Sequence, residues 1–237
     1  MITTYYPSSE RGHVNFGWLD SHHSFSFGNW HNREKVHFGA LRVLNDDTIR
    51  EGKGFDTHPH ENMEIITIPL KGALAHKDST GAEGIIYSGD VQIMSAGSGI
   101  RHSEYNASHY DPVTLLQIWI FPKQTGTKPR HDQRSFDPAD RNNHWQIVVS
   151  PRPEDLALKI NQDARLALTK MANTTTLPYH TVFPGNGIYL FLLSGQAEID
   201  GRLLHSRDGL GVTGTDEVSI HAITDTELLA IEVPMFA

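Results

Sequence analysis

The stretch MEIITIPLKGALAHKD, residues 63–78, determines the expected fold. An isoleucine-rich run is followed by Gly72 and then by a second short run, which predicts a strand, a tight turn and another strand. Helical periodicity is weak, and only parts of 128–141 and 153–158 are expected to be helical. Other short apolar runs bounded by Gly, Asp, Asn or Pro recur along the chain, at 38–44, 91–96, 114–121 and 145–150. This rhythm predicts an all-β sandwich or barrel.

The same unit occurs twice. Leu70-Lys71-Gly72 precedes ALAHKD and Gly89-Asp90 precedes VQIMSA, while Leu193-Ser194-Gly195 precedes QAEIDG and Asp208-Gly209 precedes LGVTG. Two copies of one β unit explain this order. Between the copies, residues 122–144 are polar and contain three prolines. We therefore expect an N-terminal domain at 1–121, a linker at 122–144 and a C-terminal domain at 145–237.

Composition excludes several classes of protein. The chain has 237 residues, 38% hydrophobic and 20% charged, which is typical of a globular protein with a sizeable core. It has no cysteine, so thiolate zinc sites and cysteine nucleophiles are excluded. The net charge of −8, without a basic cluster, disfavours nucleic acid as a partner. We find neither a signal peptide nor an apolar run of the roughly 18 residues that span a membrane, and we expect a cytoplasmic protein.

Two short motifs predict a metal site. In THPHENME (57–64) His58 and His60 are two residues apart, and in GIRHSEYN (99–106) the same spacing separates His102 and Glu104. Residues two apart in a strand share a face, so each pair projects together. Three imidazoles and a carboxylate suit a divalent first-row ion such as iron, copper, nickel, manganese or zinc. Glu64 has the same parity as His60 and would face the same way if the strand were regular.

Other chemistries fit less well. The sequence His60-Glu61-Asn62-Met63-Glu64 is HExxE, which lacks the second histidine of the helical zinc-protease motif. The glycines around Ser98 lack the third glycine and the following helix of a dinucleotide-binding loop. A G-x-S-x-G nucleophile elbow is absent from the sequence.

The motifs carry a family resemblance. Gly52, His58, His60, Glu64 and Gly72 are spaced like the first cupin motif, with one extra residue before the last glycine. Gly89, Gly97 or Gly99, His102 and Asn106 resemble the second motif, although its usual proline is missing. More specifically, the chain resembles the pirin family and its bacterial members with quercetin 2,3-dioxygenase activity. The stretches that carry this resemblance are ERGHVNFGWLDSHHSFSFGNW (10–30), LRVLNDD (41–47), THPHENMEIIT (57–67) and QIMSAGSGIRHSEYN (92–106).

The resemblance is strong over residues 10–121 and loose beyond them. It implies two tandem cupin-type β-barrels, a bicupin, with metal ligands at His58, His60, His102 and Glu104. Glu64 then becomes a residue that supports the ligands from behind. Fourteen residues before Gly195 stands Thr181, where the first copy has His58, and thirteen after Gly209 stands Ala222, where it has His102. The metal site is therefore expected in the N-terminal barrel only.

The resemblance also implies a function: a metal-dependent dioxygenase that cleaves flavonols such as quercetin with O2. The flavonol would bind the ion through its 3-hydroxyl, whose proton Glu104 would take as a general base. We expect Fe2+ above Cu2+, Ni2+, Mn2+, Co2+ or Zn2+, a monomer, and metal loss as the pH falls through about 6. Walls from Ile93, Met94, Ile118 and Ile120 would hold the substrate. The alternative is a metal-dependent regulatory or redox-sensing binding protein without turnover.

The remaining histidines receive simpler interpretations. His13, His22 and His23 are expected to be structural, and His76 to form a hydrogen bond at a hairpin turn or to line the mouth of the site. Trp18, Phe25 and Phe27 are assigned to the core. The other histidines are expected at the surface: His31, His37, His109, His131, His144 and His205.

Overall fold

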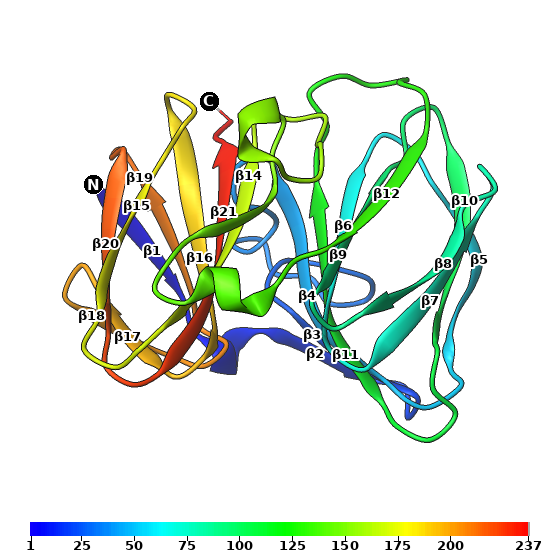
Figure 1. Cartoon of the computed structure of the whole chain (residues 1–237), viewed down its shortest axis with the longest axis horizontal. Coiled ribbons are helices and arrows are strands. Elements are labelled where there is room, and N and C mark those ends of the chain that lie inside the picture. Colours follow the sequence, from blue (N-terminus) through cyan, green and yellow to red (C-terminus); the bar gives the residue numbers. More distant parts are fainter. Residues whose placement is uncertain (237) are drawn as a thin grey trace.

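The computed structural model describes residues 1–236, which form 21 strands and three short 3-10 helices. Two β-barrels lie side by side, as Figure 1 shows, so the predicted all-β bicupin fold is confirmed. Each expected strand run overlaps a strand: residues 63–70 overlap β6 (Glu64–Lys71), and 114–121 overlap β11 (Val113–Ile120). None of the helices in residues 1–236 is long and apolar enough to cross a membrane.

The N-terminal barrel consists of a seven-stranded sheet facing a four-stranded sheet. In spatial order the larger sheet contains β12 (Arg130–Ser135), β9 (Asp90–Ser95), β6, β11, β4 (Leu41–Ile49), β3 (Leu19–His23) and β2 (Gly12–Asn15). The smaller sheet contains β5 (Gly54–His60), β10 (Ile100–Asn106), β7 (Ala73–Asp78) and β8 (Glu83–Tyr87).

The C-terminal barrel repeats this order. Its six-stranded sheet contains β1 (Ile2–Tyr6), β19 (Gly209–Thr213), β16 (Asn186–Ser194), β21 (Thr226–Pro234), β14 (Arg165–Met171) and β13 (Gln146–Val149). Its four-stranded sheet contains β15 (Thr176–His180), β20 (Glu217–Ala222), β17 (Gln196–Ile199) and β18 (Arg202–His205). Order β9-β6-β11-β4 corresponds to β19-β16-β21-β14, and β5-β10-β7-β8 to β15-β20-β17-β18. The predicted internal repeat is therefore present in the topology.

The turn glycines are equivalent too. Gly72 (φ 80°) joins β6 to β7, and Gly195 (φ 87°) joins β16 to β17. Both adopt the left-handed conformation that favours glycine, and a Cβ at Gly195 would lie 2.3 Å from the carbonyl oxygen of Asp225. These turns explain why the Leu-x-Gly pattern occurs at the same place in both copies.

Two segments depart from the predicted domain boundaries. The expected linker 122–144 includes β12, which pairs with β9 and completes the larger sheet of the N-terminal barrel. The N-terminal strand β1 pairs with β19 of the C-terminal barrel, and the chain then crosses to the other barrel (Figure 1).

Helical structure was expected in parts of 128–141 and 153–158. Only the short 3-10 helices η2 (Pro138–Arg141) and η3 (Pro153–Asp155) form there. A third, η1 (Ser8–Glu10), follows β1.

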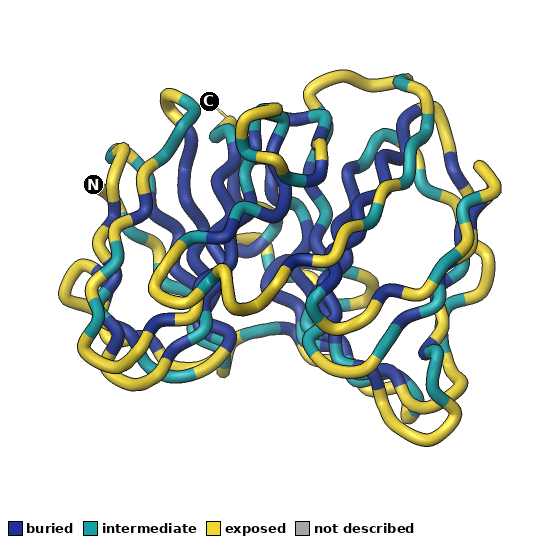
Figure 2. The backbone as a smooth tube through the Cα atoms, in the orientation of Figure 1, coloured by how far each residue is buried: buried dark blue, intermediate teal, exposed yellow. Residues whose placement is uncertain are grey.

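The largest apolar core lies between the two barrels. It combines side chains of β6, β9 and β11 with side chains of β14, β16 and β21, and Figure 2 shows this buried middle layer. Ile93, Ile118 and Ile120 belong to it, so the prediction that they line the substrate site is wrong. The pleat places every second residue of these strands on the interface side rather than inside the N-terminal barrel.

Candidate metal centre

The three predicted histidine ligands meet in the N-terminal barrel. β10 pairs with β5 so that His102 lies opposite His58 and Ile100 opposite His60. Alternation along β10 buries Ile100, His102 and Glu104 and exposes Arg101 and Tyr105. One ring nitrogen from each of the three histidines lies within 4.8 Å of the others. Their ring centroids are 4.4–4.9 Å apart.

The hydrogen bonding of these rings suits a metal ion. His102 is buried, and neither of its ring nitrogens has a hydrogen-bond partner among residues 1–236. His58 Nδ1 lies 2.7 Å from the Asp56 carbonyl oxygen, which only accepts, so Nδ1 carries the proton and Nε2 keeps a lone pair. An orphaned buried imidazole is costly unless a ligand satisfies it, and a cation among three imidazoles does so.

Two of the three rings, those of His60 and His102, are held in their neutral form. Burial, followed by the neighbouring His58, lowers the pKa of His60 to about 4. Burial and then the other imidazoles lower the pKa of His102 to about 2. Neutral imidazole is the form that binds metals, so these two side chains need no deprotonation at neutral pH.

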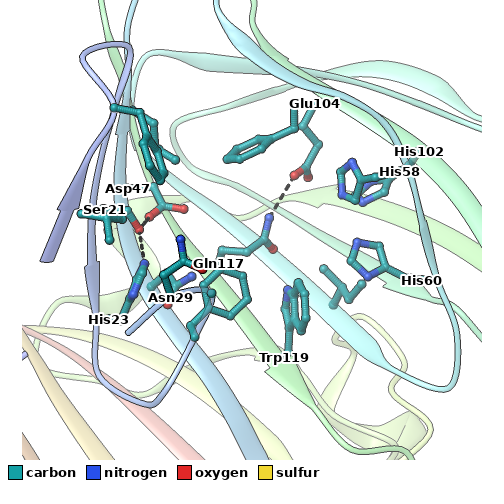
Figure 3. A pocket seen from close by; sticks show the side chains of 18 residues that line it. Ser21, His23, Asn29, Asp47, His58, His60, His102, Glu104, Gln117 and Trp119 are labelled. Carbon is teal, nitrogen blue, oxygen red and sulfur yellow. Dashed lines mark hydrogen bonds between the residues drawn. The ribbon is translucent and has the colours of Figure 1, made fainter. Parts of the chain in front are cut away.

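Glu104 lies beside His102, but its carboxylate is not part of the group that the three imidazoles form. Its carboxylate forms a second group with His76 and His102 in which the candidate ligand atoms lie within 4.8 Å of one another. Gln117 Nε2 donates to Glu104 Oε2 at 3.0 Å (Figure 3). Thr67 Oγ1 donates to Glu104 Oε1 at 3.4 Å. Burial raises the pKa of Glu104 to about 7, and Asp47 adds to the rise.

A cavity of about 310 Å3 opens in front of the imidazoles, inside the barrel. This volume is near the lower end of the roughly 300–1,000 Å3 of small-molecule sites. Trp119 packs edge-on against His60 at 4.9 Å, and Phe27 against Trp119 at 5.3 Å. Phe27 therefore lines the site, and its assignment to the core alone is wrong. The apolar lining consists of Val14, Phe16, Leu19, Phe27, Phe55, Ile65 and Trp119. Met94, like the three isoleucines above, is not part of the described lining.

With this geometry established, comparisons with known proteins identify the family. Residues 7–120 match the Pirin family model, and residues 147–233 match that of the quercetinase C-terminal cupin domain. A protein named quercetin 2,3-dioxygenase from Escherichia coli (strain K12) is 43% identical over 230 residues, covering 96% of each chain. The chain belongs to the pirin family. A pirin-like protein from Caulobacter vibrioides is 39% identical over 229 residues, with 95% of this chain and 97% of that one covered.

Solved structures agree with this assignment to the pirin family. The crystal structure of YhhW from Escherichia coli superposes with a TM-score of 0.94, at 40% identity and 99% coverage of both chains. A second structure, of bacterial pirin YhhW in complex with nickel(II), gives a TM-score of 0.93 at 39% identity, covering 99% of this chain and 100% of that one. The resemblance inferred from the motifs is therefore confirmed, over the second half of the chain as well as the first.

Glu64 does not face the cluster of this pirin-family protein. Asn62 (φ 49°) interrupts the extended backbone between β5 and β6. Alternation along one strand therefore does not place Glu64 on the same face as His60. Glu64 accepts hydrogen bonds from Ser95 Oγ at 2.8 Å and from the Asn161 backbone at 3.2 Å. It therefore ties the N-terminal barrel to the segment before β14, and it neither binds nor backs the cluster.

Behind His102, a second pair of histidines packs against the cluster. His76 is buried on β7, not in a hairpin turn, and its Nε2 lies 3.0 Å from Asp78 Oδ2, as the hydrogen-bonding interpretation expected. Its ring lies 5.4 Å from that of His102 and stacks on His131 at 4.7 Å. His131 is half-buried and bonded to Gln92, so the prediction of a plain surface residue is wrong.

The opposite wall of the cavity is polar, and no motif in the sequence predicts it. Ser21, His23, Asn45 and Asp47 line the cavity from β3 and β4. Burial raises the pKa of Asp47 to about 7 and lowers that of His23 to about 4. The period of two in LDSHH (19–23) places Ser21 and His23 on one face, which was the available signal. Nothing in the sequence indicated that this face meets the same cavity as His58.

Proposed function

We propose that this protein is a metal-dependent dioxygenase that cleaves a flavonol such as quercetin with O2. The observation that carries the proposal is His102, a buried imidazole with both nitrogens unpaired among the described residues, beside two further imidazoles at one end of an apolar cavity. The names of the relatives support the same activity.

The proposed ligands are His58, His60 and His102, with Glu104 as the fourth. A bound divalent ion would supply Lewis acidity that lowers the pKa of a coordinated hydroxyl. We propose Fe2+; nitrogen and oxygen donors also accept Cu2+, Ni2+, Mn2+, Co2+ and Zn2+, and a nickel(II) complex exists for a relative.

Glu104 is proposed as the general base as well. A carboxyl group whose pKa is about 7 exchanges a proton readily near neutral pH, which suits it to take the 3-hydroxyl proton of the substrate. The hydrogen bond from Gln117 holds its carboxylate in the cavity. Trp119 and Phe55 would contact the flat rings and exclude water from the reacting end.

The test is an assay of the metal-loaded protein in air. We expect the flavonol absorbance to disappear with uptake of one O2 per substrate and release of carbon monoxide, and we expect no change with chelated protein. Metal-loaded protein that leaves the flavonol unchanged would contradict the proposal. It would favour the alternative, a metal-dependent regulatory or redox-sensing protein, for which a metal-dependent change in partner binding is the corresponding measurement. We further expect a cytoplasmic monomer that does not bind nucleic acid.

A further inference from the structure

A second cluster of buried polar side chains lies across the cavity from the imidazoles (Figure 3). It consists of Ser21 and His23 on β3 and of Asn45 and Asp47 on β4, and we call it the β3–β4 polar wall. Strand pairing places Ser21 opposite Asp47 and His23 opposite Asn45. All four side chains are buried, and all four line the cavity.

The hydrogen bonds within this wall leave some of its acceptor atoms without a donor. Ser21 Oγ donates to Asp47 Oδ1, so the serine oxygen must accept the hydrogen bond that joins it to His23 Nε2 at 2.8 Å. His23 Nε2 then carries the ring proton, and Nδ1 keeps a lone pair. Within the described part of the chain, neither His23 Nδ1 nor Asn45 Oδ1 has a partner. Figure 3 shows the second carboxylate oxygen of Asp47 pointing into the cavity.

These unpaired groups are not explained by the metal centre. The metal-binding groups that include His58, His60, His102 or Glu104 contain none of these four residues. Gln117 and Trp119 stand between the two clusters (Figure 3). Buried acceptors without donors destabilise a protein. The second carboxylate oxygen of Asp47 faces the cavity, where a ligand that supplies O–H or N–H groups would satisfy it.

We propose that the β3–β4 polar wall binds the hydroxyl groups on the phenyl ring of the substrate, the ring attached beside the carbon that bears the 3-hydroxyl. The inference rests on the proposed function, because a flavonol anchored through its 3-hydroxyl at the imidazoles would direct its phenyl ring across the cavity. Phenolic hydroxyls are donors, and they match a wall that offers acceptors. A site built this way rejects a ring that lacks the hydroxyls, because its buried acceptors then stay unpaired.

The experiment compares two flavonols that differ only in that ring, one with two adjacent hydroxyls and one unsubstituted. Both are titrated without oxygen into metal-loaded protein, and binding is followed by tryptophan fluorescence. We expect the hydroxylated probe to bind about ten- to a hundredfold more tightly, the size of one hydrogen bond to a charged group. In Asp47→Asn the ratio should approach one, with unchanged affinity for the unsubstituted probe. In Ser21→Ala, which removes the hydroxyl that orients the Asp47 carboxylate, the ratio should fall as well.

Ser95→Ala is the matched control, since Ser95 is also a buried serine that donates to a carboxylate in the same sheet but does not line the cavity. It should keep the full ratio. Equal binding of the two probes by the wild type, or an unchanged ratio in Ser21→Ala, would overturn the inference, and Ser21→Ala decides if Asp47→Asn does not fold. Because the readout is binding without oxygen, a failure of the dioxygenase proposal would appear separately, as discrimination without turnover.

Discussion

The two barrels share a strand order but differ in what fills them. On β10 the inward residues include His102 and Glu104, whereas on the equivalent β20 they are Val218, Ile220 and Ala222. The His102–His58 pair of β10 and β5 faces a cavity, while β20 pairs Ile220 with Leu177 of β15 inside an apolar cluster. The same topology therefore holds either a polar site or a packed core.

The difference separates the causes of the fold from the causes of the site. Glycine turns and alternating apolar residues specify the strand order in both copies, independently of the interior chemistry. In the C-terminal barrel the interior side chains stabilise the fold by close packing. In the N-terminal barrel the inward imidazoles and carboxylates reduce stability until a ligand satisfies them.

The largest expected effect comes from removing the central imidazole. His102→Ala should abolish metal binding and lower kcat/KM at least a thousandfold, because a ligand of the proposed ion is lost and the transition-state stabilisation with it. Metal content per chain, measured by elemental analysis, checks the first part. His221→Ala, beside Ala222 at the position on β20 that corresponds to His102, should change neither quantity. One full equivalent of metal in His102→Ala would contradict the account.

Glu104→Gln separates proton transfer from metal binding. Three imidazoles remain, so we expect metal to be retained while kcat falls by about a hundredfold or more, the usual contribution of a general base. Glu64→Gln is the control, because Glu64 is equally buried in the same barrel yet faces Ser95 and Asn161. Equal kcat values for the two variants would exclude Glu104 as the base.

The stability of the two interiors should differ in the metal-free protein. Ile220→Ala should cost about 2–5 kcal/mol in free energy of unfolding, since it leaves a cavity in a packed core. His102→Leu should cost less than about 1 kcal/mol, because it replaces an unpaired buried imidazole with an apolar side chain. Urea unfolding with a chelator present measures both. A loss in His102→Leu as large as in Ile220→Ala would show that His102 is a core residue rather than a ligand.

The smallest expected effect is a pH dependence. Glu104 has a pKa raised to about 7, whereas those of His60 and His102 are lowered to about 4 and 2. If Glu104 binds the metal as a carboxylate, its proton must leave, so affinity should fall up to about tenfold per unit as the pH drops below 7 and level off above it. The expected reason for metal loss near pH 6 thus shifts from the histidines to Glu104.

Calorimetry in two buffers of different ionisation enthalpy measures the proton released on metal binding. We expect close to one proton at pH 6 and little at pH 8 for the wild type. Glu104→Gln should release about one proton fewer than the wild type at pH 6. Equal release by the two proteins would show that another group titrates.

The sequence predicted the fold and the histidine cluster because both depend on short-range patterns. Strand alternation and the HxH and HxE spacings determine which side chains share one face of a strand, whichever strand pairs with it. Parity failed for Glu64, because the left-handed Asn62 interrupts the strand, and for Ile93 and Ile118, because their face meets the other barrel. The polar wall at Asp47 depends on the pairing of β3 with β4 across the cavity, which is a long-range contact.

A crystal structure of the metal-loaded protein, with an anomalous difference map, tests the central claim most directly. We predict one strong peak with His58, His60 and His102 nitrogens about 2.0–2.2 Å away, and the Glu104 carboxylate turned from Gln117 toward it. A peak elsewhere, such as at the exposed His13, Asp20 and His22 group, with none at the three imidazoles, would contradict the account.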